Sequence, residues 1–454
     1  MAHPNPYWRW LAAALLALAG CENGGEPTAP PQGQVQLPAS VDSTWSRTAS
    51  LSTGRFRHTA TLMLDGKVLV AGGATKAEKR ELGTNPGLAI PARPVCVAPA
   101  CGENEQLGTA PTASAELFDP VTGRFEKARK LSTGEVVQLS RARFGHTATL
   151  LRDGRVLIIG GVGEGDEVLA SAELYDPDLE AFVEVASMSH ARAMHTATLL
   201  PDDRVLVLGG VRDISQLYGL ETFGPPKEVV SQAEAYRPEH RGFEDLGAAP
   251  RATFPHAAVL FEDGRVIVAW PQLWTENLSQ DTAELYWFDP GSDRFAPVGQ
   301  MILGGLAVEI LLHYEAAVTG ERPASFDVVT PFKEVQLQLG ADPSSGATTS
   351  QLHQPRQFDF TQSTVSTSMA FDPDRGPTLI GGWLNGTGST LATSVWTRAR
   401  PNSESHEPCL AGGECIAYWY GAGSLNVRRA WPTATTLPSG NILATGGLNS
   451  SPLS

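Results

Sequence analysis

The sequence has little positive charge for its length. Its 454 residues include 34 Lys and Arg against 49 Asp and Glu, which gives a formal net charge of −15. A charge of this sign repels nucleic acids and anionic lipid head groups, so we expect neither as the main partner. The acidity itself indicates a chain kept soluble by its surface charge.

Motifs that carry catalysis are also missing. No G-x-S-x-G, phosphate-loop or dinucleotide-binding pattern lies in the strand–turn–helix context that it needs, and no pair of histidines has the spacing of a metal site. The sequence therefore predicts no cofactor, no metal and no catalytic residue.

Long hydrophobic runs are absent apart from one at the amino terminus. Leu11 to Ala19 is a nine-residue apolar run behind Arg9, too short to cross a bilayer as a mature helix. The run ends in Leu18-Ala19-Gly20-Cys21, which resembles the lipobox of bacterial lipoproteins. The resemblance implies a signal peptide at 1–20 and a lipid on Cys21, whereas the alternative is ordinary secretion with a fortuitous cysteine.

The segment at 21–40 is rich in Pro, Gly and Gln and cannot bury enough apolar surface to fold. We expect it to tether a folded body at 41–454 to the cell envelope, at the outer membrane or cell surface. The lipid is then the protein's only contact with the membrane.

Cysteine is scarce, with five in the chain. Apart from Cys21, they form two close pairs, Cys96 with Cys101 and Cys409 with Cys415. In an exported protein such pairs favour two local disulfides. A metal site is the alternative, but neither pair has the two-residue spacing of a zinc knuckle.

One stretch recurs along the chain. Its clearest copy, RFGHTATLLRDGRVLIIGG, begins at Arg143, and related copies begin at Arg55, Arg192, Thr253 and Arg428. The apolar runs on either side of an Asp-Gly turn predict a β-hairpin. The closing diglycine lets the backbone bend where a Cβ would collide with a neighbouring element. The glycines concerned are Gly72, Gly73, Gly160, Gly161, Gly209, Gly210, Gly446 and Gly447.

A second motif follows each of the first four hairpins, as in SAELYDPDLEAF from Ser171. Two aromatic residues seven apart flank a turn, which predicts a second hairpin and hence a unit of four strands. The fourth copy carries two extra residues, Tyr286 and Trp287, and an even insertion keeps the same strand face inward.

Four antiparallel strands, a diglycine after the second and paired aromatics on the last two resemble the kelch repeat, over about half of the chain. The resemblance implies an all-β fold, a kelch-type β-propeller. It also implies that a glutamate in each third strand is structural: Glu116, Glu173, Glu234 and Glu284. We expect seven blades if 301–340 forms one and six if it is an insertion. We also expect the segment from Val41 to Leu51 to supply an outer strand to the last blade, so that both termini close the ring.

Four histidines recur at one position of the repeat: His58, His146, His195 and His256. A ring would place them symmetrically, so we interpret them as structural residues that form hydrogen bonds within each first strand. The variable segments between second and third strands, at 74–112, 162–170, 211–231 and 271–281, all belong to one face of a propeller. Long loops on a rigid scaffold are where binding sites are built. We call this the loop-bearing face.

These observations favour a monomeric, non-enzymatic binding module that holds an envelope or extracellular protein or a glycan. An envelope component with a purely structural role is not separable from it by sequence. The alternative is a propeller enzyme related to galactose-oxidase-like carbohydrate oxidases, which would need an unpaired cysteine beside a tyrosine. Sialidases are disfavoured because their repeated S-x-D-x-G-x-T-W boxes are absent.

Overall fold

The computed structural model describes residues 45–76, 80–81, 105–106, 109–130, 132–214, 228–251, 256–261, 263–272, 282–302, 311–315, 325–329, 334–338, 363–365, 368–372, 376–380, 383–385, 390–391, 394–398, 419–426 and 432–447. By its internal contacts the chain divides into Met1–Ala39 and Ser40–Ser454, and every described residue belongs to the second unit. Among the described residues, no helix has the length and hydropathy needed to cross a membrane.

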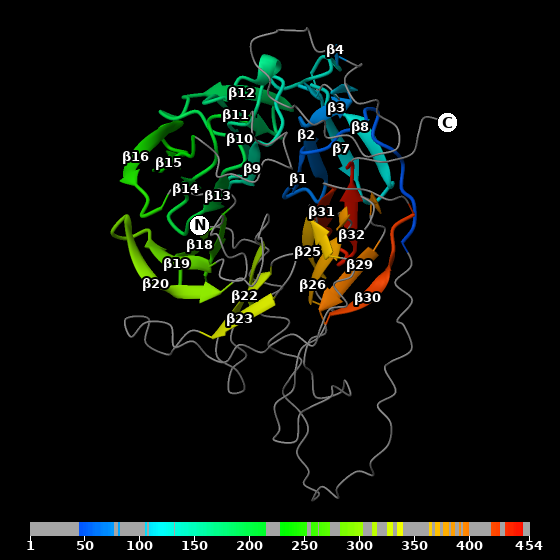
Figure 1. Cartoon of the computed structure of the whole chain (residues 1–454). Coiled ribbons are helices and arrows are strands. Elements are labelled where there is room, and N and C mark those ends of the chain that lie inside the picture. Colours follow the sequence, from blue (N-terminus) through cyan, green and yellow to red (C-terminus); the bar gives the residue numbers. More distant parts are fainter. Residues whose placement is uncertain are drawn as a thin grey trace, which may run out of the picture. The chain divides into compact units, whose positions relative to one another are not determined.

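Four antiparallel sheets of four strands follow one another along the chain (Figure 1). The first sheet holds β1 (Thr59–Leu62), β2 (Val68–Ala71), β7 (Ala115–Asp119) and β8 (Arg124–Lys127). The second holds β9 (Thr147–Leu150), β10 (Val156–Ile159), β11 (Ala172–Asp176) and β12 (Ala181–Val185). The third holds β13 (Thr196–Leu199), β14 (Val205–Leu208), β15 (Gln232–Arg237) and β16 (Gly242–Ala248). The fourth holds β17 (Ala257–Leu260), β18 (Val266–Gln272), β19 (Thr282–Asp289) and β20 (Arg294–Ile302).

Three further sheets come later in the chain. β21 (Leu311–Glu315), β22 (Ser325–Val329) and β23 (Glu334–Gln338) form a three-stranded sheet. β25 (Ser368–Asp372), β26 (Gly376–Ile380), β29 (Ser394–Arg398) and β30 (Trp419–Ser424) form a four-stranded one. β31 (Thr433–Thr436) pairs with β32 (Ile442–Thr445) as the C-terminal hairpin.

The remaining strands form small ladders. β3 (Ala74–Lys76) pairs with β6 (Thr109–Pro111), and β4 (Arg80–Glu81) pairs with β5 (Glu105–Gln106). β24 (Ser363–Val365), β27 (Trp383–Asn385) and β28 (Thr390–Leu391) make a sheet of three, and one short 3-10 turn, η1, covers Glu164–Asp166.

The hydrophobic core lies between successive sheets. Leu69 and Ala71 of β2 pack with Val156 and Ile158 of β10, and further clusters join the second sheet to the third and the third to the fourth. The second strands are buried on both faces because each lies between two neighbours, which explains their continuous apolar sequence.

The first strands contact one another in a continuous series: β21, β17, β13, β9, β1, β31 and β25. The C-terminal hairpin therefore lies beside the first sheet, with Leu443 of β32 in one cluster with Val68 and Val70 of β2. The predicted all-β class is confirmed, and repeated four-stranded antiparallel sheets fit a β-propeller-like fold. Closure of the ring and its number of blades stay predictions.

The segment expected to close the ring forms no strand over its described part, Trp45 to Leu51. Its described residues pack against other parts of the fold instead. Trp45 packs with Ile380 and Leu425, and the Ala49 amide donates to the Gly123 carbonyl. Strand pairing by the part before Trp45 falls outside the described residues.

Candidate functional site

The recurring histidines join one sheet to the next. Nε2 of His146 lies 3.0 Å from Oγ1 of Thr59 in the first sheet, and His195 and His256 make the same contact with Thr147 and Thr196. His58 instead contacts Oγ1 of Thr445, the last residue of β32 in the C-terminal hairpin, at 2.9 Å. The expected hydrogen bond within each first strand is thus replaced by one between sheets.

The first glycine of each diglycine fits against this histidine. A Cβ on Gly160 would lie 2.4 Å from the Arg192 carbonyl oxygen and 2.9 Å from Cε1 of His195, and φ of this glycine is +61°. Gly446 meets His58 in the same way, and the Gly447 amide donates to the Arg55 carbonyl as Gly161 does to that of Arg192. The C-terminal hairpin and the first sheet therefore meet in the same joint as the other sheets.

A buried arginine lies close to the histidine in each of the first three repeats. Arg143 donates from Nη1 to the carbonyls of Gly160 and Ser171 and from Nη2 to Oε1 of Glu173 at 2.7 Å. The other carboxylate oxygen of Glu173 accepts the Ser140 amide. Arg55 with Glu116 and Arg192 with Glu234 repeat the arrangement, and all six side chains are at most 1% exposed.

Sequence reasoning placed the glutamates in the third strands but missed these arginines as a set. The available signal was an arginine three residues before each of the first three histidines. The partners of Arg143 and Glu173 all belong to one repeat, so each pair fixes the segment before the first strand to its own sheet. Because the polar groups of the pair are used in these bonds, none is left for a ligand.

Burial keeps His146, His195 and His256 neutral. It lowers the pKa of His146 to about 3 and that of His256 to about 4, and it lowers the pKa of His195 well below its usual value. In His146 and His195 the nearby arginines lower the pKa further. A histidine that is buried, neutral and repeated in successive sheets is suited to a structural contact and not to proton transfer.

The fourth sheet departs from this pattern. In the first three sheets the glutamate lies opposite the third residue of the second strand, as Glu116 does opposite Val70. In the fourth, Tyr286 occupies that place opposite Val268, and Glu284 lies two residues farther along, opposite Trp270. Trp270 and Pro271 stand where the other repeats have the diglycine, and β18 continues as a strand to Gln272.

The displaced glutamate has a displaced arginine. Arg251 precedes His256 by five residues, whereas Arg55 precedes His58 by three. Arg251 donates from Nε to Oε2 of Glu284 at 2.8 Å and from Nη2 to Oε1 at 2.7 Å, and the Tyr286 hydroxyl donates to Oε2 at 3.1 Å. The Arg251 side chain is 47% exposed and that of Glu284 16%. The hydrogen bonds from Arg251 lower the pKa of Glu284, so the carboxylate stays ionised.

The described residues at the loop-bearing ends of the first and second strands form a buried apolar cluster. Phe56, Phe144 and Ala193 precede the first strands and pack with Val162 and other residues that follow the diglycines. Between them, the Gly145 amide donates to the Arg57 carbonyl and the Met194 amide to the Gly145 carbonyl. The apolar cluster and these backbone bonds make a rigid floor beneath the variable segments.

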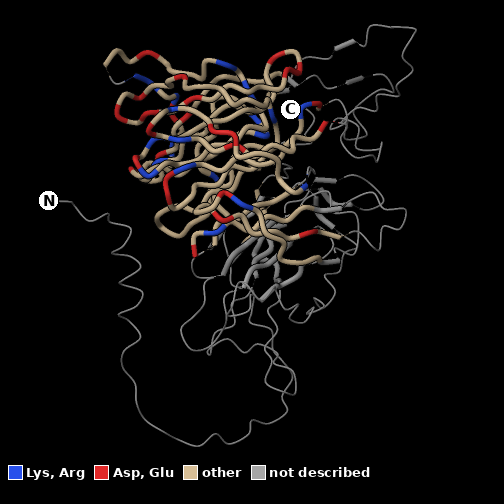
Figure 2. Tube along the Cα trace, turned by 90° about the vertical axis from the view of Figure 1, so that its left-hand side faces the viewer, with Lys and Arg blue, Asp and Glu red and all other residues tan. Residues whose placement is uncertain are grey.

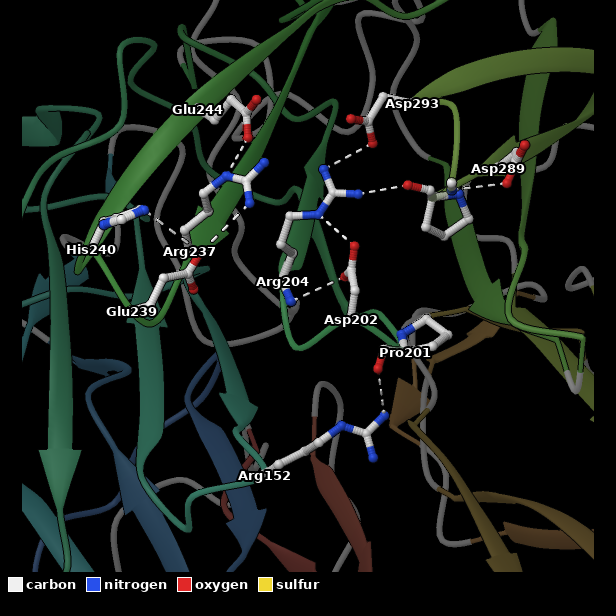
Figure 3. Close-up of polar contacts among 12 residues, drawn as sticks. Arg152, Pro201, Asp202, Arg204, Arg237, Glu239, His240, Glu244, Asp289 and Asp293 are labelled. Carbon is white, nitrogen blue, oxygen red and sulfur yellow. Dashed lines mark hydrogen bonds and ion pairs between the residues drawn. The ribbon is translucent and has the colours of Figure 1, made fainter.

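The opposite face carries the short turns, and its polar groups bind one another. Arg204, in the turn after β13, pairs with Asp202 and with Asp293 of the fourth sheet and donates to the Pro290 carbonyl (Figure 3). Arg237 pairs similarly with Glu244 and Glu239. These contacts fix turns between and within sheets.

Charge is interleaved over the described chain. Acidic and basic residues are interspersed along the described part of the tube in Figure 2. Within the described ranges, no group of three or more His, Cys, Asp or Glu could hold a metal ion. Cys21, Cys96, Cys101, Cys409 and Cys415 lie outside the described residues, so lipidation and disulfide pairing stay predictions.

Comparison with known proteins gives little. No family model matches the sequence, and no curated protein matches it. Among solved structures, the chain is similar to one titled "Structure of YjhT", with 11% identity, a TM-score of 0.43, and coverage of 88% of this chain and 93% of that one. A likeness this distant carries no argument about function.

Proposed function

We propose that this protein is a kelch-type β-propeller of seven blades that acts as a monomeric, non-enzymatic binding module through its loop-bearing face. The observation that carries the proposal is the contrast between the two faces. Turns on one face are short and held by ion pairs such as Arg204 with Asp202. On the other face, segments of very different length connect strands whose ends pack in the buried apolar floor. Six blades are the alternative count.

The buried polar groups support a non-enzymatic role. In the first three sheets, histidine, arginine and glutamate bond to the backbone or to the adjacent sheet. They are therefore occupied in holding the scaffold, and the residues that could distinguish one ligand from another are those that differ between repeats.

The proposed setting is the bacterial cell envelope. A lipid on Cys21 would anchor the chain, the segment at 21–40 would serve as tether, and disulfides Cys96–Cys101 and Cys409–Cys415 would clip two loops. Cys21→Ala should release the protein from membranes on fractionation; unchanged membrane association contradicts the anchor.

Envelope pull-down with a loop-replaced variant tests the binding role. The segment at 74–112 is replaced by the shorter 162–170, and Val121→Ser on the turn face serves as the control. Loss of captured partners with the replacement, and not with the control, supports the proposal. Equal capture by both variants contradicts it.

The enzyme alternative predicts a different result. A galactose-oxidase-like protein loaded with copper should produce hydrogen peroxide from primary alcohols, whereas a binding module should not. Copper-dependent peroxide production that survives purification would overturn the binding proposal.

A further inference from the structure

The fourth sheet is longer than its neighbours at the loop-bearing end. β18 and β19 pair from Val266 with Phe288 to Gln272 with Thr282, whereas β2 and β7 stop at Ala71 with Ala115. The valine–aromatic pair at the other end keeps its register, so the added length lies toward the loops. At about 3.4 Å per residue, a two-residue step carries Glu284 about 7 Å outward.

This step changes what the ion pair can do. In the second sheet, Arg143 donates to two backbone carbonyls in addition to Glu173, and both side chains are fully buried. Arg251 pairs with Glu284 through two parallel hydrogen bonds, yet almost half of its side chain is exposed. These two bonds use Nε and Nη2, and a guanidinium has five N–H donors in a fixed plane. The ion pair therefore keeps its geometry and presents donors to solvent.

An aromatic side chain lies beside the pair and is itself fixed. The Tyr286 ring meets the fully buried Trp270 edge to face, with centroids 5.2 Å apart, and its hydroxyl donates to Glu284. Trp270 also packs against Phe295 of β20. The tyrosine is thus held by packing from below and by a hydrogen bond at its tip, which preorganises the group for binding.

The chemistry of the group indicates its ligand. The arginine and glutamate carry no net charge together, so the pair attracts neither cations nor anions strongly. It offers N–H donors and carboxylate acceptors side by side, next to an aromatic ring. Adjacent hydroxyls of a sugar ring both donate and accept hydrogen bonds, and the C–H face of the ring packs on aromatic surface.

We propose that Arg251, Glu284 and Tyr286 form a binding site for a neutral saccharide on the loop-bearing face of the fourth sheet. The proposal rests on the binding function proposed above and names its ligand class. The site uses only the rigid strands β18 to β20 and the residue Arg251, five before His256.

The test uses the full chain on an array of neutral and carboxylated oligosaccharides, followed by calorimetric titration with the strongest neutral binder. Glu284→Gln and Arg251→Ala should each weaken binding at least tenfold, and Tyr286→Phe severalfold. Arg237 and Glu244 supply the control, since they form an exposed ion pair on the turn face, in the third sheet. Glu244→Gln should leave saccharide affinity unchanged and the melting temperature close to that of the natural chain.

The possible outcomes distinguish the saccharide site from the binding function proposed for the whole loop-bearing face. Neutral-saccharide binding that survives Glu284→Gln and Arg251→Ala overturns this site and leaves the binding function standing. Binding of carboxylated oligosaccharides alone overturns the ligand class. Absence of saccharide binding, with protein partners still captured through the loops at 74–112, overturns the site alone; absence of both removes the proposed function as well.

Discussion

The first three sheets and the fourth pack their loop-bearing ends with different side chains. In the first three, a glycine meets the histidine of the adjacent sheet, and a buried arginine–glutamate pair fixes the segment before the first strand. In the fourth, Trp270 takes the glycine's place, Tyr286 takes the glutamate's, and the ion pair lies at the surface. The interior of the fourth sheet is therefore filled by aromatic packing, as in the contact of Trp270 with Tyr286.

The difference explains where the repeat signature ends. A residue larger than glycine at the Trp270 position leaves no room for the histidine contact seen at Gly209, where a Cβ would lie 2.4 Å from Cε1 of His256. The sheet that follows, β21–β23, accordingly has no histidine motif in its sequence. The same type of ion pair is thus buried in one setting and lies at the surface in the other.

Lowering the pH should give the largest loss of stability, because it acts on several of the buried histidines at once. His146, His195 and His256 have lowered pKa values in the folded state, so below about pH 6.5 the unfolded chain binds protons that the folded chain does not. The free energy of unfolding therefore decreases as the pH is lowered, until the pH reaches the pKa of the folded state, which is about 4 for His256. Between pH 7.5 and 5 we expect a loss of about 2 kcal/mol for each histidine, about 6 kcal/mol for the three.

Urea denaturation at the two pH values measures this loss. His195→Asn should shrink the difference by about 2 kcal/mol, since one titrating group is removed. The control is Val121→Ser, an exposed substitution on the turn face that removes no titrating group and should leave the difference unchanged. An equal pH dependence in His195→Asn and the natural chain would contradict neutral histidines in the joints.

Breaking a buried ion pair should have the next largest effect. Glu173→Ala leaves the fully buried Arg143 without its carboxylate, and removing one partner of a buried pair costs about 3–5 kcal/mol. Because the Ser140 amide also loses its acceptor, the urea midpoint should fall well below that of the natural chain. A loss of unfolding free energy less than a quarter of this value would mean that the stability of the fold does not depend on the pair.

Adding a methyl group tests the glycine of the joint. Gly160→Ala combines a positive φ with contacts below 3.0 Å to the Arg192 carbonyl and His195, so we expect a loss of about 2–4 kcal/mol. Gly134→Ala is the matched control, because Gly134 has φ +70° with no atom within 4 Å of the added Cβ. It should lose only about 1 kcal/mol. Equal losses would show that backbone conformation alone requires the diglycine.

The sequence predicted the strands better than the contacts between them. The Asp-Gly turns and paired aromatics located the hairpins, and Tyr175 does lie directly opposite Phe182. Within 301–340, which the sequence left as a blade or an insertion, the structure describes the three-stranded sheet of β21, β22 and β23. Local pattern fixes strands because alternation and turn chemistry are short-range properties.

Contacts between sheets join residues far apart in the chain, as His58 and Thr445 are, and no local pattern specifies them. The displacement of Glu284 was open to prediction, however. The extra residues Tyr286 and Trp287 lie between Glu284 and the aromatic Phe288 that sets the register. An insertion at that place keeps the inward face but moves the glutamate two residues toward the loops.

The smallest effect should come from the displaced pair itself. Glu284→Ala removes the carboxylate that Arg251 and Tyr286 contact, yet Arg251 remains in solvent, where an unpaired guanidinium is hydrated at no large cost. We expect a urea curve that overlaps that of the natural chain, in contrast to Glu173→Ala. A loss as large as that of Glu173→Ala would return Glu284 to the scaffold and remove the reason to assign it to a ligand. Overlapping curves would leave an ion pair that stabilises nothing, on the face where binding is proposed.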